Sequence, residues 1–276
     1  MIYVNGEFHS GLSPLVLVKD RGFLFGDGVF TTIRLANRQI EFFESHCERF
    51  LSHCSGMKIS SPQINQSDIL KLIKLNDAHV GIWRLKIIAS AKAGQVDLSG
   101  LREIGTNVML LEPHVAPLKK YCSLWAYPKP AESPLSSFKT LGCASRFFIL
   151  DEAISQGCDD ALMINLEGFV TETAFANFFW RVGSDLFTPS STLPLMSGLA
   201  LTFIKKATES MGCNWHEVRV KPEQIPMEAQ LFICNSMTGI VPVTVYNQMD
   251  FGRDLEFEAK LKDGYNLLRN QLSLKF

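Results

Sequence analysis

Strand-length apolar runs and amphipathic helical segments are mixed along this chain without strict alternation. Asn5-Gly6, between Ile2–Val4 and Glu7-Phe8, is a strong hairpin signal. The apolar runs Trp83–Ala89 and Val108–Leu111 are typical of buried strands. Further strands are expected near residues 29–35, 122–127, 161–165, 169–170, 176–180, 186–188, 231–235 and 240–245. Because the order is not a regular βαβ repeat, the pattern predicts an α+β chain and not a doubly wound sheet.

Five segments have helical spacing: residues 45–55, 67–76, 142–156, 198–211 and 255–272. In the first, Ser45 is the expected N-cap, with Glu48 reaching back from three residues further on. In the third, the spacing places Phe147, Leu150 and Ile154 on one face.

The segment Glu112–Pro117 contains two prolines and no periodicity, which is typical of a linker. The length of 276 residues also favours two domains. We therefore expect an N-terminal α+β domain over residues 1–112 and a C-terminal domain over residues 118–276.

Composition excludes several classes of function. A net charge of −1, with no run of Lys and Arg longer than a pair, gives no sign of a nucleic-acid or acidic-lipid partner. Seven cysteines without C-x-x-C spacing argue against a disulfide framework and a zinc site, and six dispersed histidines indicate no metal. No signal peptide and no bilayer-spanning run of roughly 20 apolar residues is evident. We expect a cytoplasmic protein.

One anion site can be argued from local pattern. Pro194–Gly198 leads into the helix expected from residue 198, where Ser197 can act as the cap. Gly198 lets a ligand approach the free N–H groups, whose positive end suits a phosphate. A plain helix start explains the same residues, so both interpretations stay open. No nucleotide-binding glycine loop and no G-x-S-x-G hydrolase elbow is present.

Two stretches, Asp20–Arg34 and Val170–Phe179, carry a joint motif that continues through Leu186–Thr188 to Met196–Leu199. It contains a Glu, an Asn five residues later, an apolar-aromatic pair, a Thr after a strand and an apolar-x-Gly turn into a helix. This order resembles the class IV (fold type IV) enzymes that depend on pyridoxal 5′-phosphate (PLP). Leu201 departs from it, since the family has Lys or Arg there. The resemblance implies a two-domain fold like that of D-amino-acid aminotransferase, with PLP bound by the C-terminal domain.

The resemblance assigns the cofactor lysine to Lys139, which stands 33 residues before Glu172. Lys139 would bind PLP as a Schiff base and then move protons as general base and acid. Glu172 would face the pyridine nitrogen and keep it protonated, which strengthens PLP as an electron sink. Arg49 matches the family's phosphate-binding arginine, whose planar fork can donate two bonds at once.

The resemblance also implies a phosphate cradle. The backbone N–H groups of Leu199 and Ala200 would hold the phosphate at the helix start. Ser236 would offer hydroxyl and backbone donors from a second loop, which also contains Met237. Asn177 would support the backbone of the site.

Three activities share this scaffold: branched-chain aminotransferase, D-amino-acid aminotransferase and 4-amino-4-deoxychorismate lyase. Cys143 and Ala144 stand where branched-chain enzymes have a Tyr, and residues 89–94 lack the Arg-x-His of D-amino-acid enzymes. Residues 30–34 match the Phe-Thr-Thr-x-Arg that lyases favour, whereas residues 92–97 lack the lyases' Arg-Gly-rich stretch.

The resulting hypothesis is a lyase of folate biosynthesis that releases pyruvate and leaves 4-aminobenzoate. Thr32 and Arg34 would help to bind or protonate the substrate, and Lys92 or Arg84 would supply the charge that the missing stretch provides elsewhere. An aminotransferase acting on D-amino or branched-chain amino acids, and a PLP-binding homologue without turnover, are the alternatives. The resemblance further implies a homodimer.

Overall fold

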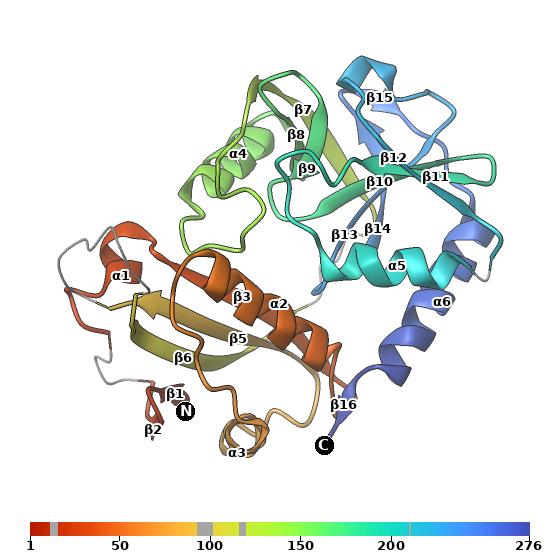
Figure 1. Ribbon diagram of the computed structural model, residues 1–276. Helices are drawn as coiled ribbons and strands as arrows, with labels where there is room; N and C mark the ends of the chain where they lie inside the picture. Colours follow the sequence, from red (N-terminus) through yellow and green to blue (C-terminus); the bar gives the residue numbers. More distant parts are fainter. Residues whose placement is uncertain (12–15, 93–101, 116–119, 210) are drawn as a thin grey trace. The chain divides into compact units, whose positions relative to one another are not determined.

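The computed structural model describes residues 1–11, 16–92, 102–115, 120–209 and 211–276. The chain forms two compact units (Figure 1). The first contains Met1–Ala116, Phe138–Cys143 and Arg269–Phe276, and the second contains Pro117–Ser137 and Ala144–Leu268. The division differs from the contiguous one expected from the sequence, because the segment with Lys139 and the C-terminal residues group with the first unit. Residues 116 and 117 of the expected linker lie outside the described residues.

The first unit contains, in its described part, a seven-stranded sheet with the order β16-β4-β3-β5-β6-β1-β2. Its elements are β1 (Ile2–Val4), β2 (Glu7–His9), α1 (Arg21–Phe25), β3 (Gly28–Ala36), β4 (Gln39–Ile40), α2 (Phe43–Gly56), α3 (Gln66–Leu75), β5 (Ile82–Ala91), β6 (Ile104–Pro113) and β16 (Leu274–Lys275). The predicted hairpin is confirmed as β1–β2, with positive φ at both Asn5 and Gly6.

Strand β3 presents two different faces because successive side chains of a strand point to opposite sides. Val29, Ile33 and Leu35 are buried and pack with α2, α3 and β5 in one apolar core. The alternate positions, Phe30, Thr32 and Arg34, are only half-buried. The alternation along β3 therefore places the core residues on one face and the residues that remain accessible to a ligand on the other.

Helix α2 begins two residues earlier than expected. Its N-cap is Phe42, in the left-handed region at φ 49°, so the prediction that Ser45 caps this helix is wrong. His46, Phe50 and Cys54 are buried at four-residue spacing. The apolar members of this row belong to the core shared with β3 and β5.

The second unit contains, among its described residues, a nine-stranded sheet with the order β12-β11-β10-β13-β14-β7-β8-β9 and β15 paired to β14. Its elements are β7 (Cys122–Pro130), α4 (Ala144–Ser155), β8 (Asp160–Ile164), β9 (Val170–Thr173), β10 (Asn177–Val182), β11 (Asp185–Pro189), α5 (Leu199–Glu209), β12 (Asn214–Val218), η1 (Pro222–Gln224), β13 (Gln230–Asn235), β14 (Gly239–Tyr246), β15 (Met249–Asp250) and α6 (Leu255–Gln271). The α+β prediction is confirmed by this mixture of helices and sheets.

Helix α4 buries a different face from the one expected. Ile149 and Ala153 are its buried residues, whereas Phe147 and Ile154 are 56% and 57% exposed. The spacing found the helix correctly but not the side that packs, because several faces of this helix are apolar.

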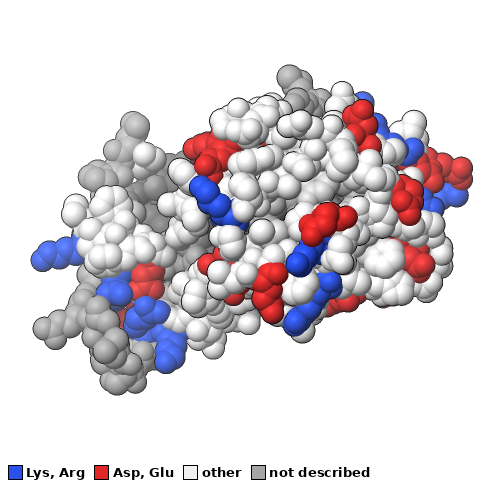
Figure 2. Space-filling view, turned by 90° about the horizontal axis from the view of Figure 1, so that it is seen from above, with Lys and Arg blue, Asp and Glu red and all other residues white. Residues whose placement is uncertain are grey.

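On the face shown in Figure 2, acidic and basic side chains of the described residues are interspersed. Among the described residues, no helix has both the length and the apolar character needed to cross a membrane.

Candidate cofactor site

Lys139 lies in the first unit, in a segment fixed beside the start of β3. Its carbonyl accepts a hydrogen bond from the Phe30 N–H at 2.9 Å, and the Leu141 N–H donates to the Gly28 carbonyl at 2.9 Å. Val29 and Thr140 form an antiparallel bridge between these contacts. A Cβ on Gly28 would lie 2.6 Å from both the Ala89 carbonyl oxygen and Leu141 Cδ1, so the close approach requires glycine there.

Helix α2 holds the same segment from its C-terminal half. The Lys139 N–H donates to Nδ1 of His53 at 3.0 Å, and the His53 ring packs edge-on against Phe138 at 5.5 Å. A Cβ on Gly56 would lie 2.3 Å from the Phe138 ring, so this glycine makes room for it. Both backbone polar groups of Lys139 are therefore hydrogen-bonded. The backbone is held in place, and this limits the positions that the side-chain amine can reach.

The Lys139 ammonium lies 4.7 Å from the Phe30 ring centroid, and the Lys86 ammonium lies 4.9 Å from the same ring. Lys86 pairs across β3–β5 with Thr32, so both share the face of the sheet that carries Phe30. Thr32, a predicted site residue, is thus beside Lys86 in the first unit. We call Phe30, Thr32 and Lys86 the cationic strand face.

Arg49 also lies in the first unit, half-buried on α2. Burial lowers the pKa of its guanidinium to about 10, so it stays protonated at neutral pH. Burial, together with the charges of Arg49 and Lys139, lowers the pKa of His53 to about 4 and that of His46 well below its ordinary range. The two histidines are therefore neutral. The Arg49 guanidinium between them remains charged, and a phosphate group would need such a cation.

Arg34, predicted to contact substrate, has a partner within the first unit. Its guanidinium is hydrogen-bonded to the buried carboxylate of Glu41, and Arg269 lies 3.5 Å from the same carboxylate. Desolvation raises the pKa of Glu41, and the two arginines oppose this rise. The contact of Arg34 with substrate stays a prediction.

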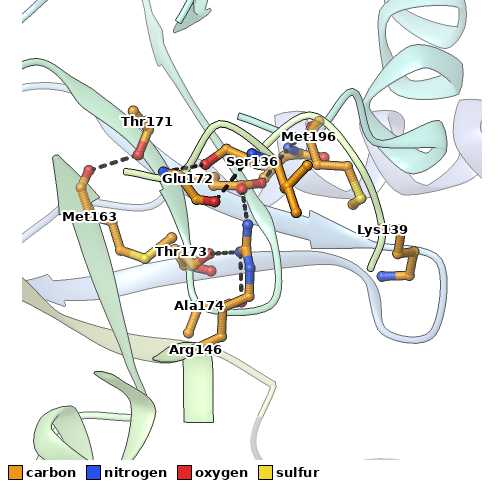
Figure 3. A network of polar contacts seen from close by, with 12 residues as sticks. Ser136, Lys139, Arg146, Met163, Thr171, Glu172, Thr173, Ala174 and Met196 are labelled. Carbon is orange, nitrogen blue, oxygen red and sulfur yellow. Dashed lines mark hydrogen bonds and ion pairs between the residues drawn. The ribbon is translucent and has the colours of Figure 1, made fainter. Parts of the chain in front are cut away.

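Glu172 lies on β9 in the second unit and is 3% exposed. Its Oε1 accepts a 2.5 Å hydrogen bond from Nη2 of Arg146 (Figure 3). Its Oε2 lies 3.5 Å from Nδ2 of Asn177. Nη1 of Arg146 donates to the carbonyls of Ala174 at 2.9 Å and Thr173 at 3.4 Å. The carboxylate that the sequence assigned to the pyridine nitrogen is therefore buried, ion-paired and oriented.

The predicted phosphate cradle also belongs to the second unit. Helix α5 begins at Leu199, so the N–H groups of Leu199 and Ala200 lie in its first turn, where a helix leaves such groups without helical partners. Nδ2 of Asn177 donates to the Met196 carbonyl at 2.9 Å, as expected for a residue that supports the site's backbone. A Cβ on Gly198 would lie 1.7 Å from Oδ1 of Asn177, so these two residues fit only with glycine.

The loop between β13 and β14 is held by Asn235. Its Oδ1 accepts hydrogen bonds from the N–H groups of Met237 and Thr238, each at 2.9 Å. The Met237 amide is thus bonded inside the loop, and Ser236 remains its predicted phosphate donor. Nδ2 of Asn235 donates to the Phe175 carbonyl at 3.3 Å, which ties this loop to the turn that follows Glu172.

The residues present fit PLP. Taken by itself, the second unit holds a buried carboxylate suited to a ring nitrogen and a glycine-dependent helix start suited to a phosphate. Taken by itself, the first unit holds a lysine on a fixed backbone and a half-buried arginine. Nε2 of His46 is a buried polar atom without a partner among the described atoms, on the same helix as Arg49. Residues 93–97, part of the segment where lyases have their Arg-Gly-rich stretch, lie outside the described residues. Lys92, at the start of this segment, is described and forms an ion pair with Glu103.

Sequence reasoning missed Arg146, His53 and Lys86. Arg146 and His53 act through partners distant in sequence, Glu172 and Lys139, and no local spacing indicates these pairs. Lys86 had a signal: an ionisable residue inside an otherwise apolar strand run.

Comparison with known proteins agrees with this geometry. The family model for class IV amino-transferases matches residues 28–246. An aminodeoxychorismate lyase of Bacillus subtilis is 25% identical over 91% of this chain and 88% of its own length. A putative branched-chain-amino-acid aminotransferase of Methanocaldococcus jannaschii is 23% identical over 99% and 98%. The solved branched-chain aminotransferase of Thermoproteus uzoniensis superposes with a TM-score of 0.88 at 17% identity, over 98% of this chain and 95% of that one. The chain belongs to the class IV aminotransferase family, whose cofactor is PLP.

Proposed function

We propose that this enzyme is an aminodeoxychorismate lyase, which converts 4-amino-4-deoxychorismate into pyruvate and 4-aminobenzoate for folate synthesis. The observation that carries the proposal is the cationic strand face. The Lys86 ammonium lies 4.9 Å from the Phe30 ring centroid, with Thr32 opposite it on the neighbouring strand, and Lys139, the cofactor lysine, lies 4.7 Å from the same ring. A substrate that carries carboxylates matches the Lys86 ammonium in charge. The Bacillus subtilis relative with the same activity in its name supports it.

The roles of the residues follow from their chemistry. PLP, when bound, supplies an electron sink for the bond that breaks. Arg49, the N–H groups of Leu199 and Ala200, and Ser236 would hold its phosphate, and Glu172 would accept a hydrogen bond from its ring nitrogen. The Lys139 amine takes the ring proton that must leave for the substrate ring to become aromatic. The carbon–oxygen bond to the enolpyruvyl group then breaks, and protonation of the released enol gives pyruvate.

The experiment is to incubate the PLP-loaded protein with 4-amino-4-deoxychorismate in the absence of any keto acid. Release of pyruvate and 4-aminobenzoate in equal amounts is the expected result, because the reaction needs no amino acceptor. The Lys139→Ala variant is the control, and it should release neither. Intact cofactor binding without release would contradict the lyase assignment.

A class IV aminotransferase is the second candidate, favoured by the relative from Methanocaldococcus jannaschii. It is tested on a panel of D-amino and branched-chain amino acids, with 2-oxoglutarate or pyruvate as acceptor. Turnover there, without lyase activity, would establish this function. Failure of both assays in a protein that binds PLP would indicate a homologue without turnover.

We further propose that the chain acts in the cytoplasm as a homodimer. Phe147, Phe148 and Ile154 of α4 are 56%, 59% and 57% exposed, and apolar exposure of this kind is typical of an interaction surface. Light scattering coupled to size-exclusion chromatography should give twice the chain mass of 30.9 kDa.

A further inference from the structure

Arg146 has three contacts that converge on the strand carrying Glu172 (Figure 3). Its guanidinium reaches from the first turn of α4 to Glu172 Oε1 and to the carbonyls of Thr173 and Ala174. The Glu172 side chain is 4% exposed and that of Arg146 26%. The planar fork is therefore braced by two backbone carbonyls while it holds one oxygen of a buried carboxylate.

This geometry has two consequences for the carboxylate. A bond of 2.5 Å between Nη2 and Oε1 fixes the plane of the carboxyl group, so that its second oxygen points in one direction. The positive charge also offsets the cost of keeping Glu172 ionised where little solvent reaches it. Loss of that charge would favour the neutral carboxylic acid.

The same charge acts on a ring nitrogen that bonds to Glu172. A proton shared by the carboxylate and the nitrogen sits on the nitrogen only while the carboxylate is the weaker base. Arg146 touches the carboxylate directly, so its attraction for the carboxylate exceeds its repulsion of a nitrogen placed beyond it. The net effect is to favour the charged pair of carboxylate and pyridinium.

We propose that Arg146 is a positioning residue that keeps Glu172 ionised and oriented, and thereby keeps the ring nitrogen of PLP protonated. The inference rests on the assignment of Glu172 to that nitrogen, and it holds equally for a lyase and for an aminotransferase.

The test is the NMR shift of PLP labelled with ¹⁵N in the ring, bound to the wild type and to Arg146→Met, Arg146→Lys and Glu172→Gln variants, without substrate. The wild type should show a protonated nitrogen. Arg146→Met and Glu172→Gln should move the shift toward neutral pyridine, and Arg146→Lys should restore most of the protonated signal because it keeps the charge. An unchanged shift in Arg146→Met would overturn the proposal. An unchanged shift in Glu172→Gln would overturn both it and the assignment of Glu172.

Arg253→Met is the matched control. Arg253 forms a similar pair in the same unit, with Glu258, and the side chains are 31% and 5% exposed. This variant should lose comparable stability without any change in the ¹⁵N shift.

Cofactor affinity gives a second measurement. If Arg146→Met folds poorly, Arg146→Gln replaces it in this measurement. PLP should bind about tenfold more weakly to the variant, the value of one weakened charge-assisted bond. The analogue with carbon in place of the ring nitrogen should bind the variant and the wild type equally. An equal loss for both ligands would show a general structural role and contradict the proposal.

Discussion

The backbone N–H of Lys139 donates a 3.0 Å hydrogen bond to Nδ1 of His53. Because this nitrogen accepts, the neutral ring carries its proton on Nε2. The lowered pKa of His53, about 4, keeps the ring in this form at neutral pH. A neutral histidine on α2 thus fixes the start of the segment that carries the cofactor lysine.

His53→Phe keeps a ring against Phe138 but removes the acceptor, whereas His53→Asn keeps an acceptor and removes the ring. We expect kcat to fall about tenfold in His53→Phe, the value of a bond of about 1–1.5 kcal/mol, and less in His53→Asn. The visible absorption of the lysine-bound cofactor should shift only in His53→Phe. The exposed His79, changed to Ala, is the control. The reverse order of the two variants would show that ring packing matters more than the bond.

Stability should fall as the pH drops from about 6.5 toward 4. The unfolded chain binds protons at His46 and His53 near the ordinary value of 6.5, but the folded chain resists until lower pH because both pKa values are lowered. More protons are then bound in the unfolded state, and the free energy of unfolding decreases with acidity. Urea unfolding at pH 7, 5.5 and 4.5 measures it. His53→Asn should flatten the dependence, and an unchanged slope would count against burial of this histidine.

Gly198→Ala should weaken the binding of PLP. The new Cβ would lie 1.7 Å from Asn177 Oδ1, so either Asn177 or the start of α5 must move. We expect the dissociation constant of PLP to rise at least about tenfold, equivalent to about 1.4 kcal/mol. Gly252→Ala is the control in the same unit, since nothing lies within 4 Å of its Cβ position. Fluorescence titration with PLP compares the two, and equal affinities would contradict the cradle.

Lys86→Met should raise KM for a dicarboxylate substrate about tenfold or more, with a smaller effect on kcat. The reason is that the variant cannot form the partly buried ion pair between the Lys86 ammonium and a substrate carboxylate. Lys71 provides a matched variant, since its ammonium lies over the Phe8 ring at 4.4 Å. Lys71→Met should leave KM unchanged. Steady-state kinetics of both variants decide whether the cationic strand face recognises substrate or only packs.

Arg34→Met separates a structural role from a substrate role. Removing this charge leaves the buried Glu41 carboxylate with one cationic partner, Arg269, at 3.5 Å. Loss of one partner of a buried ion pair lowers the free energy of unfolding by about 3–5 kcal/mol when no other partner remains, so a smaller loss is expected here. We expect a lower melting temperature, measured by calorimetry. A drop in kcat/KM at a temperature where the variant is fully folded would support the predicted contact with substrate, and unchanged kinetics would remove Arg34 from the site.

Periodicity predicted the long elements of this fold and failed where structure depends on distant partners. Strand β5 and helix α3 follow from sustained spacing, whereas β4 and β16 have two residues each and no period to detect. Helix α1 has five residues and depends on Asp20 accepting from the Phe23 N–H. Phe42, the N-cap of α2, has a left-handed backbone conformation that bulky residues seldom adopt. The sequence pattern therefore favoured Ser45 as the N-cap.

The candidate site shows the same division. Lys139, Glu172 and Arg49 were predicted from the order and spacing of motifs along the chain. Their partners His53 and Arg146 are set by packing, and a pair such as Arg146 and Glu172, 26 positions apart, leaves no trace in local spacing.

The first unit is built from three separate stretches of chain, the middle one only six residues long and containing Lys139. A gene fragment that ends near residue 116 would therefore encode neither the lysine nor strand β16. The unit cannot be inherited, truncated or exchanged as a contiguous module, and its sheet is complete only once strand β16 has been synthesised.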